Sequence, residues 1–143
     1  MSVRNILNEK GHQVFTMAPG ATLQEAAREL ADRKIGAVIL TDDNGRIAGI
    51  LSERDIVRMI ARNGAACLDQ SISEVMTKKV VTCTEAATLD DLMELMTKGR
   101  FRHIPVEDHG RLVGVISIGD VVKRRIEDAL EEAEQMRSYI AAG

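Results

Sequence analysis

Along the chain, segments with hydrophobic residues at helical spacing alternate with short segments rich in β-forming residues. Apolar side chains that recur every three or four residues predict an amphipathic helix, and short β-rich runs on either side of a polar turn predict a hairpin. The first half of the chain shows both patterns after a short apolar run. The elements expected are a strand near residues 14–16, a helix over 23–31, hairpin strands over 37–40 and 47–51, and a second helix from residue 55 to 60.

The second half repeats this order of elements. Val14-Phe15-Thr16 aligns with Val80-Val81-Thr82, and Ala21-Thr22-Leu23 aligns with Ala87-Thr88-Leu89, both at a shift of 66 residues. After a one-residue deletion the shift becomes 65, and Gly49, Ser52 and Asp55 then fall on Gly114, Ser117 and Asp120. The second copy therefore predicts a strand at 80–83, a helix from 89 to 96, hairpin strands at 103–106 and 112–117, and a final helix from 120.

Each copy is preceded by a short leading segment. Residues 3–7 and 72–76 share an order of one apolar, two polar and two apolar side chains, which predicts one helical turn each. Units of about 60 residues are marginally stable alone, so we expect one fused, pseudo-symmetric α/β (α+β) module of two β-α-β-β-α repeats packed through their sheets. The expected divisions are repeat one at 3–62, a connector at 63–71, repeat two at 72–126 and a helical extension at 127–143.

The C-terminal segment continues the periodicity past the second repeat. Apolar side chains recur at Val122, Ile126, Leu130, Ala133, Met136 and Ile140, which predicts one helix from Gly119 to Ala141. This stripe is longer than its own repeat needs, so we expect it to contact a second copy or module. The alternative is that the helix folds back along its own repeat.

Composition and charge narrow the classes of partner. The chain has 143 residues, 45% hydrophobic and 29% charged, which disfavours disorder. Its 19 basic and 22 acidic side chains give a net charge of −3, and its aromatic residues number three, so we expect no nucleic-acid partner. The apolar runs are far shorter than the roughly 20 residues that span a bilayer, and residues 1–5 lack the apolar run of a signal peptide. We therefore expect a cytoplasmic protein without a membrane partner.

Neither metal binding nor catalysis has a visible motif. Cys67 and Cys83 lie in no Cys-x-x-Cys spacing, and we expect free thiols. His103 is the histidine that suggests a general base, but no motif links it to a nucleophile or to an orienting group. We therefore expect no metal site and no enzymatic activity.

Two related sequence motifs lie where a buried strand enters a helix, and we call them the Ser-x-x-Asp words. They are Gly49-Ile50-Leu51-Ser52-Glu53-Arg54-Asp55 and Gly114-Val115-Ile116-Ser117-Ile118-Gly119-Asp120. Ser-x-x-Asp at this place is a helix-capping arrangement. The same geometry also suits a ligand, because free N–H groups and a hydroxyl can bind phosphate and a carboxylate can accept from sugar hydroxyls. The sequence leaves both interpretations open, with the strand residues before each serine as apolar walls for a base.

The duplicated unit, these two words and Arg102-His103-Ile104-Pro105-Val106 resemble a tandem pair of CBS (cystathionine β-synthase) domains, a Bateman module, over residues 3–126. The resemblance implies a non-enzymatic sensor without a catalytic cofactor, which binds AMP, ADP, ATP, NAD or S-adenosylmethionine between the paired domains. It also implies a homodimer and a regulated partner in trans. The aspartate of each word would hold ribose and the serine would face phosphate.

The resemblance assigns residues to two sites, to which the residue pattern itself adds Lys34, Arg54 and the apolar wall residues Leu51 and Ile116. The first takes Thr16, Lys34, Gly36, Ala37, Leu51, Ser52, Arg54 and Asp55, and the second takes Thr82, Arg102, His103, Ile116, Ser117 and Asp120. Because Arg100, Arg102 and His103 belong to the second repeat, we expect unequal sites, with the second better suited to phosphate. The alternatives are a structural dimerisation module with vestigial sites and an enzyme that acts on a nucleotide.

Overall fold

The computed structural model describes residues 2–142. In the first half the elements are α1 (Val3–Lys10), β1 (Thr16–Met17), α2 (Leu23–Arg33), β2 (Ala37–Thr41), β3 (Ile47–Ser52) and α3 (Glu53–Asn63). Two 3-10 turns then follow, η1 (Ala65–Asp69) and η2 (Ile72–Glu74). In the second half the elements are α4 (Leu89–Gly99), β4 (His103–Asp108), β5 (Arg111–Ser117) and α5 (Ile118–Ala142).

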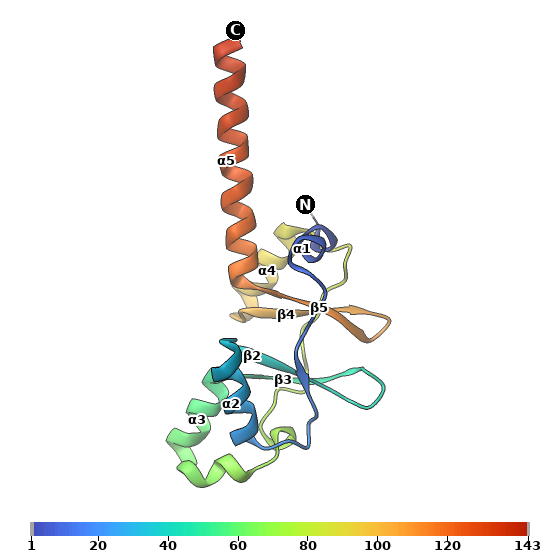
Figure 1. Ribbon diagram of the computed structural model, residues 1–143, viewed down its shortest axis with the longest axis vertical. Helices are drawn as coiled ribbons and strands as arrows, with labels where there is room; N and C mark the ends of the chain where they lie inside the picture. Colours follow the sequence, from blue (N-terminus) through green and yellow to red (C-terminus); the bar gives the residue numbers. More distant parts are fainter. Residues whose placement is uncertain (1, 143) are drawn as a thin grey trace.

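Two small sheets lie in the middle of the molecule, with helices on their outer sides (Figure 1). In the first sheet β1 runs parallel to β2, and β2 pairs antiparallel with β3. In the second sheet β4 pairs antiparallel with β5. Helices α2 and α3 cover the first sheet, and α1 and α4 cover the second. The predicted α/β class and both hairpins are confirmed.

The strand expected at residues 80–83 does not form. Cys83 makes a single parallel bridge to Val106, where the Cys83 N–H donates to the Pro105 carbonyl at 3.0 Å. The next ladder bond would need a backbone N–H from Pro105, and proline has none. Ile39 stands at the equivalent position of the first repeat, and β1 pairs there with Thr16.

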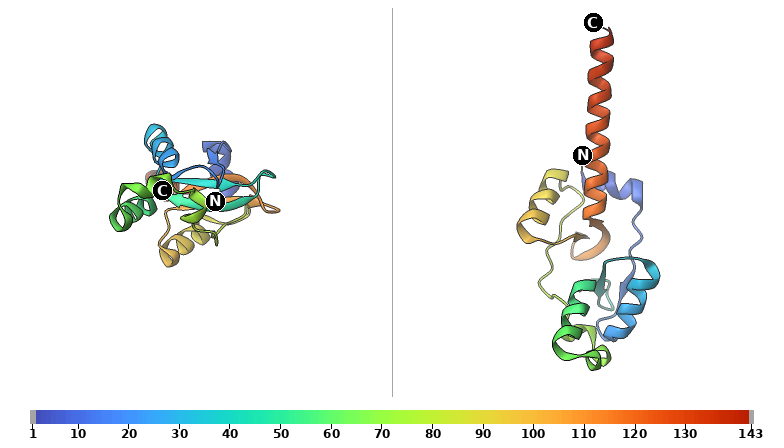
Figure 2. Two further views of the ribbon diagram at one scale, coloured as in Figure 1. Left: turned by 90° about the horizontal axis from the view of Figure 1, so that it is seen from below. Right: turned by 90° about the vertical axis from the view of Figure 1, so that its left-hand side faces the viewer.

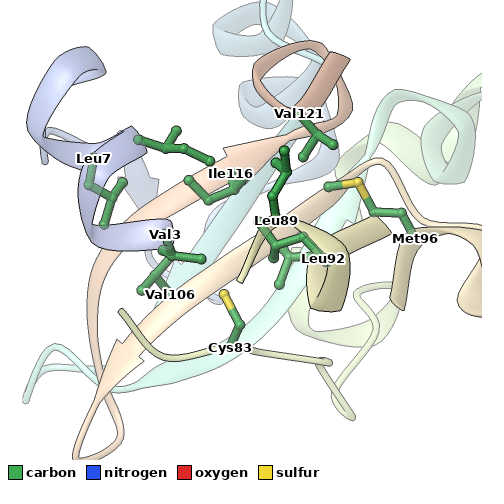
Figure 3. Close-up of a cluster of buried hydrophobic side chains, with 11 residues drawn as sticks. Val3, Leu7, Cys83, Leu89, Leu92, Met96, Val106, Ile116 and Val121 are labelled. Carbon is green, nitrogen blue, oxygen red and sulfur yellow. The ribbon is translucent and has the colours of Figure 1, made fainter. Parts of the chain in front are cut away.

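The two leading segments are exchanged between the halves. Val3, Ile6 and Leu7 of α1 belong to the core of the second repeat, where Figure 3 shows Val3 and Leu7 beside Val106 and Ile116. Conversely, Ile72 lies in the core of the first repeat. Backbone hydrogen bonds hold both segments, because the Val3 N–H donates to the Ala87 carbonyl and the Ile72 N–H donates to the Ala21 carbonyl, each at 2.8 Å.

The glycine that opens each of the two Ser-x-x-Asp words is required by this exchange. A Cβ on Gly49 would lie 2.6 Å from the Met76 sulfur, and a Cβ on Gly114 would lie 2.7 Å from a methyl carbon of Leu7. Both contacts are shorter than van der Waals packing allows. Glycine at these positions therefore lets the leading segment of the other repeat pack directly on the strand.

Helix α5 leaves the body of the molecule after its first turns and projects away from it (Figure 2). Within this 25-residue helix Val121 is the buried hydrophobic residue, whereas Val122, Ile126 and Ile140 are exposed. The predicted length of the helix is confirmed, and the alternative of folding back is wrong. None of the described helices, α5 included, is both long and apolar enough to cross a membrane.

We predict that Gly49→Ala lowers the free energy of unfolding by about 1–3 kcal/mol, because the added methyl group overpacks a buried contact with Met76. Urea denaturation followed by circular dichroism measures the change. The control is Gly20→Ala, where a Cβ would meet nothing within 4 Å. Equal effects of the two substitutions would contradict the packing argument.

Candidate functional site

Both Ser-x-x-Asp words form capping boxes at the starts of their helices. At α3 the Ser52 N–H donates to Asp55 Oδ2 at 2.9 Å, and the Asp55 N–H donates to Ser52 Oγ at 3.2 Å. At α5 the Ser117 N–H donates to Asp120 Oδ2 at 2.9 Å, and the Asp120 N–H donates to Ser117 Oγ at 3.1 Å. The capping interpretation is therefore confirmed. It leaves the hydroxyl proton of each serine and one oxygen of each aspartate as groups that can face a ligand.

The start of α3 borders a cavity of about 490 Å³, which we call the Ser52 cavity. Its lining combines the α3 start of the first repeat with two segments of the second repeat, residues 77–81 and 99–103. Gly36, Ala37 and Ile50 complete the wall on the side of the first repeat. The volume lies in the range of small-molecule sites.

The Ser52 cavity is positively charged although the chain is not. Five cationic side chains line it, against the two carboxylates of Glu53 and Asp55, an excess of three positive charges. The five are Arg54, Arg58, Lys79, Arg100 and Arg102. Arg100 ends α4 in the left-handed conformation, with φ of 56°. Convergent cations of this kind favour an anionic ligand.

A second cavity of about 360 Å³ lies at the position related to the first by the repeat, and we call it the Ser117 cavity. Here residues 13–15 and 34–37 take the places that 79–81 and 100–103 take in the Ser52 cavity. Two cationic residues, Lys10 and Lys34, line it. The two cavities therefore share a plan but differ in charge.

Lys10 binds the aspartate beside the Ser117 cavity. Its Nζ donates to Asp120 Oδ2 at 2.7 Å and to the Val115 carbonyl at 2.9 Å. Burial by itself raises the pKa of Asp120, but the hydrogen bonds from Lys10 and from Ser117 outweigh burial and hold that pKa below its ordinary value. The carboxylate that a ribose would need at this cavity already has a cationic partner.

The structure groups the predicted site residues differently from the sequence. Arg102 and His103 of the second repeat line the Ser52 cavity together with Ser52, Arg54 and Asp55. Lys34 of the first repeat lines the Ser117 cavity with Ser117, and Gly36, Ala37 and His103 line both cavities. Each cavity therefore takes residues of its Ser-x-x-Asp word from one repeat, and the segments that lead into the strands from the other repeat.

Five predicted residues fall outside both linings, namely Thr16, Leu51, Thr82, Ile116 and Asp120. Leu51 and Ile116 are completely buried in the two cores, because alternation along β3 and β5 turns Ile50 and Val115 toward the cavities instead. The expectation that Leu51 and Ile116 wall a site is corrected accordingly. Thr16 and Thr82, on the approach segments, are not among the lining residues of either cavity.

Sequence reasoning missed several lining residues, among them Lys10, Arg58, Lys79 and Phe101. Arg58 had a signal, because it stands four residues after Arg54 and so shares a face of α3. Lys79 also had one, since it precedes the aligned segment Val80-Val81-Thr82. No signal in the sequence pointed to Lys10, because only the exchange of the leading segments brings α1 to the second repeat.

His103 lies between the two cavities. Its ring packs on the backbone of Gly36, where a Cβ would lie 3.3 Å from the His103 Cε1 atom. The pKa of His103 is lowered, first by burial and then by the charge of Lys10, against weaker opposing effects from Asp120 and Glu53. His103 is therefore a neutral wall of both cavities at neutral pH.

The described residues offer no set of metal ligands, since no three His, Cys, Asp or Glu side chains among them gather around one point. Cys67 and Cys83 are both buried free thiols. Burial and the nearby Glu107 raise the pKa of Cys83 to about 11, which disfavours the reactive thiolate.

Comparison with known proteins gives a family and several similar structures. Residues 3–62 and 72–127 each match the family model of the CBS domain. The fold is similar to that of the CBS-domain containing protein ATU1752 from Agrobacterium tumefaciens, with a TM-score of 0.84 and 54% identity, covering 87% of this chain and 99% of that one.

Two further similar structures contain ligands. The CBS domain pair of MJ0100 was solved in complex with 5-methylthioadenosine and S-adenosyl-L-methionine, at a TM-score of 0.79 and 26% identity over 90% of this chain and 98% of that one. The CBS domain protein PAE2072 from Pyrobaculum aerophilum was solved in complex with AMP. Its TM-score is 0.75 and its sequence identity 28%, covering 84% of this chain and 89% of that one. This chain spans 69%, 61% and 24% of the lengths of three curated relatives that it matches.

We predict that wild-type protein loses more stability below pH 6.5 than the His103→Gln variant does. The pKa of His103 is lower in the folded state than its ordinary value of 6.5, so the unfolded chain binds the proton more readily. The contribution of this group is complete above that value and is lost as the pH falls toward the folded-state pKa. Urea denaturation at a series of pH values measures the difference. His109→Gln, at a side chain that is 95% exposed, is the control, and parallel stability curves for wild type and His103→Gln would contradict the prediction.

Proposed function

Because the chain belongs to the CBS domain family, we propose that it is a regulatory module that binds an adenine nucleotide in the Ser52 cavity and acts on a partner protein in trans. The observation that carries the proposal is the lining of that cavity. It joins a helix start, a carboxylate and five cations in one space of about 490 Å³. The proposal is a binding function, not a catalytic one.

The phosphate groups of the nucleotide are assigned to the cations. The start of α3 alone is a weak phosphate site, because the Glu53 N–H already donates to the Gly36 carbonyl at 3.0 Å and the Asp55 N–H to Ser52 Oγ. Arg54, Arg100 and Arg102 supply charge-assisted hydrogen bonds instead. The hydroxyl proton of Ser52 adds one donor.

Asp55 is assigned to the ribose. Its Oδ2 accepts from the Ser52 N–H, so the position of the carboxylate is fixed by the capping box. A carboxylate retains further acceptor positions after one such bond, enough for two vicinal hydroxyls. The capping and binding interpretations of the Ser-x-x-Asp word are thus compatible at α3.

The base is assigned to the apolar part of the lining. Ala37, Ile50, Val80 and Val81 provide aliphatic surface, and Phe101 adds an aromatic ring. An adenine ring packs favourably against such surfaces. The similar structures that contain AMP, S-adenosyl-L-methionine or 5-methylthioadenosine support an adenosyl ligand as the class. AMP, ADP, ATP and NAD carry the phosphates that the cations favour, and S-adenosylmethionine is the adenosyl ligand without them.

The same family membership supports a homodimer as the working form. The regulated partner would be a separate protein, and action in the cytoplasm stays a prediction of the sequence. Binding to the Ser52 cavity would reach that partner through the helices and strands that line it, which come from both repeats.

We predict that Asp55→Ala weakens AMP binding by roughly tenfold or more, because hydrogen bonds to a charged group contribute about 1.5–3 kcal/mol. Isothermal titration calorimetry with AMP, ATP and NAD on the full chain measures the change. The control is Asp91→Ala, which removes the equivalent capping box with Thr88 at the start of α4. Similar affinities of the Asp55→Ala and wild-type proteins would reject the assigned site. If none of the three nucleotides bound to the wild-type protein, the proposed function would be rejected.

We also predict one AMP per chain, because Lys10 already holds Asp120 at the Ser117 cavity. Asp120→Ala should therefore leave the measured affinity within about twofold of wild type, a difference of less than about 0.5 kcal/mol. The stoichiometry of the same titrations tests this. Two equivalent AMP molecules per chain, or a loss of affinity in Asp120→Ala as large as in Asp55→Ala, would show the assignment to be wrong.

A further inference from the structure

Helix α5 carries a continuous apolar stripe along its exposed length. Consecutive members are spaced by four, three, four, three and four residues, and they are Val122, Ile126, Ala129, Ala133, Met136 and Ile140. This set differs from the stripe predicted from the sequence at one place, since Ala129 replaces Leu130, which is exposed beside it. We call this set the α5 stripe. The exposed fractions of its four larger side chains are 50% for Val122, 55% for Ile126, 61% for Met136 and 71% for Ile140.

The body of the molecule contacts a different face of α5. Val121 enters the core, and the Arg124 guanidinium lies 2.8 Å from Glu9 of α1. Arg125 faces Asp90 of α4 at 3.5 Å. At about 100° per residue, Val121 and Arg124 lie about 100° and about 160° from the middle of the stripe, and Arg125 lies about 60° from it, beside its edge. The body therefore anchors the base of α5 and leaves the stripe uncovered.

We propose that the α5 stripe pairs with the same stripe of a second copy of this chain as a parallel, two-stranded coiled coil. The alternating spacing of three and four residues is the heptad pattern, which assigns Ile126, Ala133 and Ile140 to position a and Val122, Ala129 and Met136 to position d. β-Branched residues at position a, here Ile126 and Ile140, are typical of two-stranded parallel coiled coils, although these usually carry leucine at position d. The helix of 25 residues is about 37 Å long, enough for roughly three heptads.

The charges beside the stripe select the parallel arrangement. In a parallel pair Glu132, at position g, faces Arg137 of the second copy, at position e, and symmetry gives this attraction twice. In an antiparallel pair in which the same six stripe residues meet, Glu132 faces Glu132 of the second copy and Lys123 faces its Arg137. Both of these contacts join side chains of like charge. Among the described residues neither Glu132 nor Arg137 has an ion-pair partner within its own chain.

Alanine at the two middle layers limits the strength of the pairing. Ala129 and Ala133 bury little apolar surface, so the contact depends on Ile126 and Ile140 on either side of them. We therefore expect an association that dissociates on dilution. This inference does not depend on nucleotide binding, since the α5 stripe lies outside both cavities.

The first test is sedimentation of the full chain over a range of concentrations. Ile140→Lys should raise the dimer dissociation constant about tenfold or more, a cost of at least about 1.4 kcal/mol. The matched control is Ser138→Lys, which adds the same charge at the outer position f and should leave the constant unchanged. Both side chains are exposed in the monomer, so neither variant disturbs the fold.

Charge reversal tests the direction of pairing. Arg137→Glu should weaken a parallel dimer, because it places two carboxylates together, and the double variant Glu132→Arg with Arg137→Glu should restore it. An antiparallel dimer would instead be strengthened by Arg137→Glu, because that change places a carboxylate opposite Lys123. Strengthening would overturn the proposal.

Oxidative cross-linking tests the register. Met136→Cys at position d should form a disulfide-linked dimer on a non-reducing gel, whereas Ser138→Cys should remain monomeric under the same oxidation. The native Cys67 and Cys83 are buried and do not compete. A chain that is monomeric at all concentrations, or a dimer unaffected by Ile140→Lys and not linked through Met136→Cys, would assign the α5 stripe to another occupant and overturn the proposal.

Discussion

The exchange of the two leading segments is the constraint on which the rest of the structure depends. Helix α1 completes the core of the second repeat, and the segment at Ile72 completes the core of the first. Neither repeat has a full core without a segment that precedes the other in sequence. The halves are therefore held together by the two exchanged segments as well as by packing between the repeats.

The exchange also makes the two cavities unequal. Thr77, just after the leading segment of the second repeat, pairs with Ile50 through backbone hydrogen bonds of 3.0 and 2.9 Å. At the equivalent place in the other half Lys10 binds the Val115 carbonyl with its side chain and continues to Asp120. A backbone contact in one half thus corresponds to a lysine contact in the other. Among the described residues the Asp55 carboxylate has no cationic partner, whereas the Asp120 carboxylate is already paired with Lys10.

Much of the fold could be predicted from the sequence, because it depends on local signals. The hairpins follow from β-rich runs around polar turns, and the helix starts follow from Ser or Thr three residues before a carboxylate. The grouping of site residues could not be predicted, because the exchange is a long-range contact with no local signal. Pro105 shows a second limit. The alignment of the repeats predicted a strand at 80–83, but Pro105 has no backbone N–H to extend the pairing, and a single bridge at Cys83 remains. Lys10 shows a third, because its partner lies 110 residues away.

The continuous helix α5 links the Ser117 cavity to the α5 stripe. Asp120 lies in the first turn of the helix, where Lys10 holds it, and the stripe begins two residues later at Val122. No glycine or proline interrupts residues 120–142, so α5 is one continuous helix without a kink residue. A tilt of its first turn would therefore become a larger displacement at Ile140. The contact of Lys10 with Asp120 is therefore one of the contacts that hold the base of α5, together with the burial of Val121 and the ion pairs of Arg124 and Arg125.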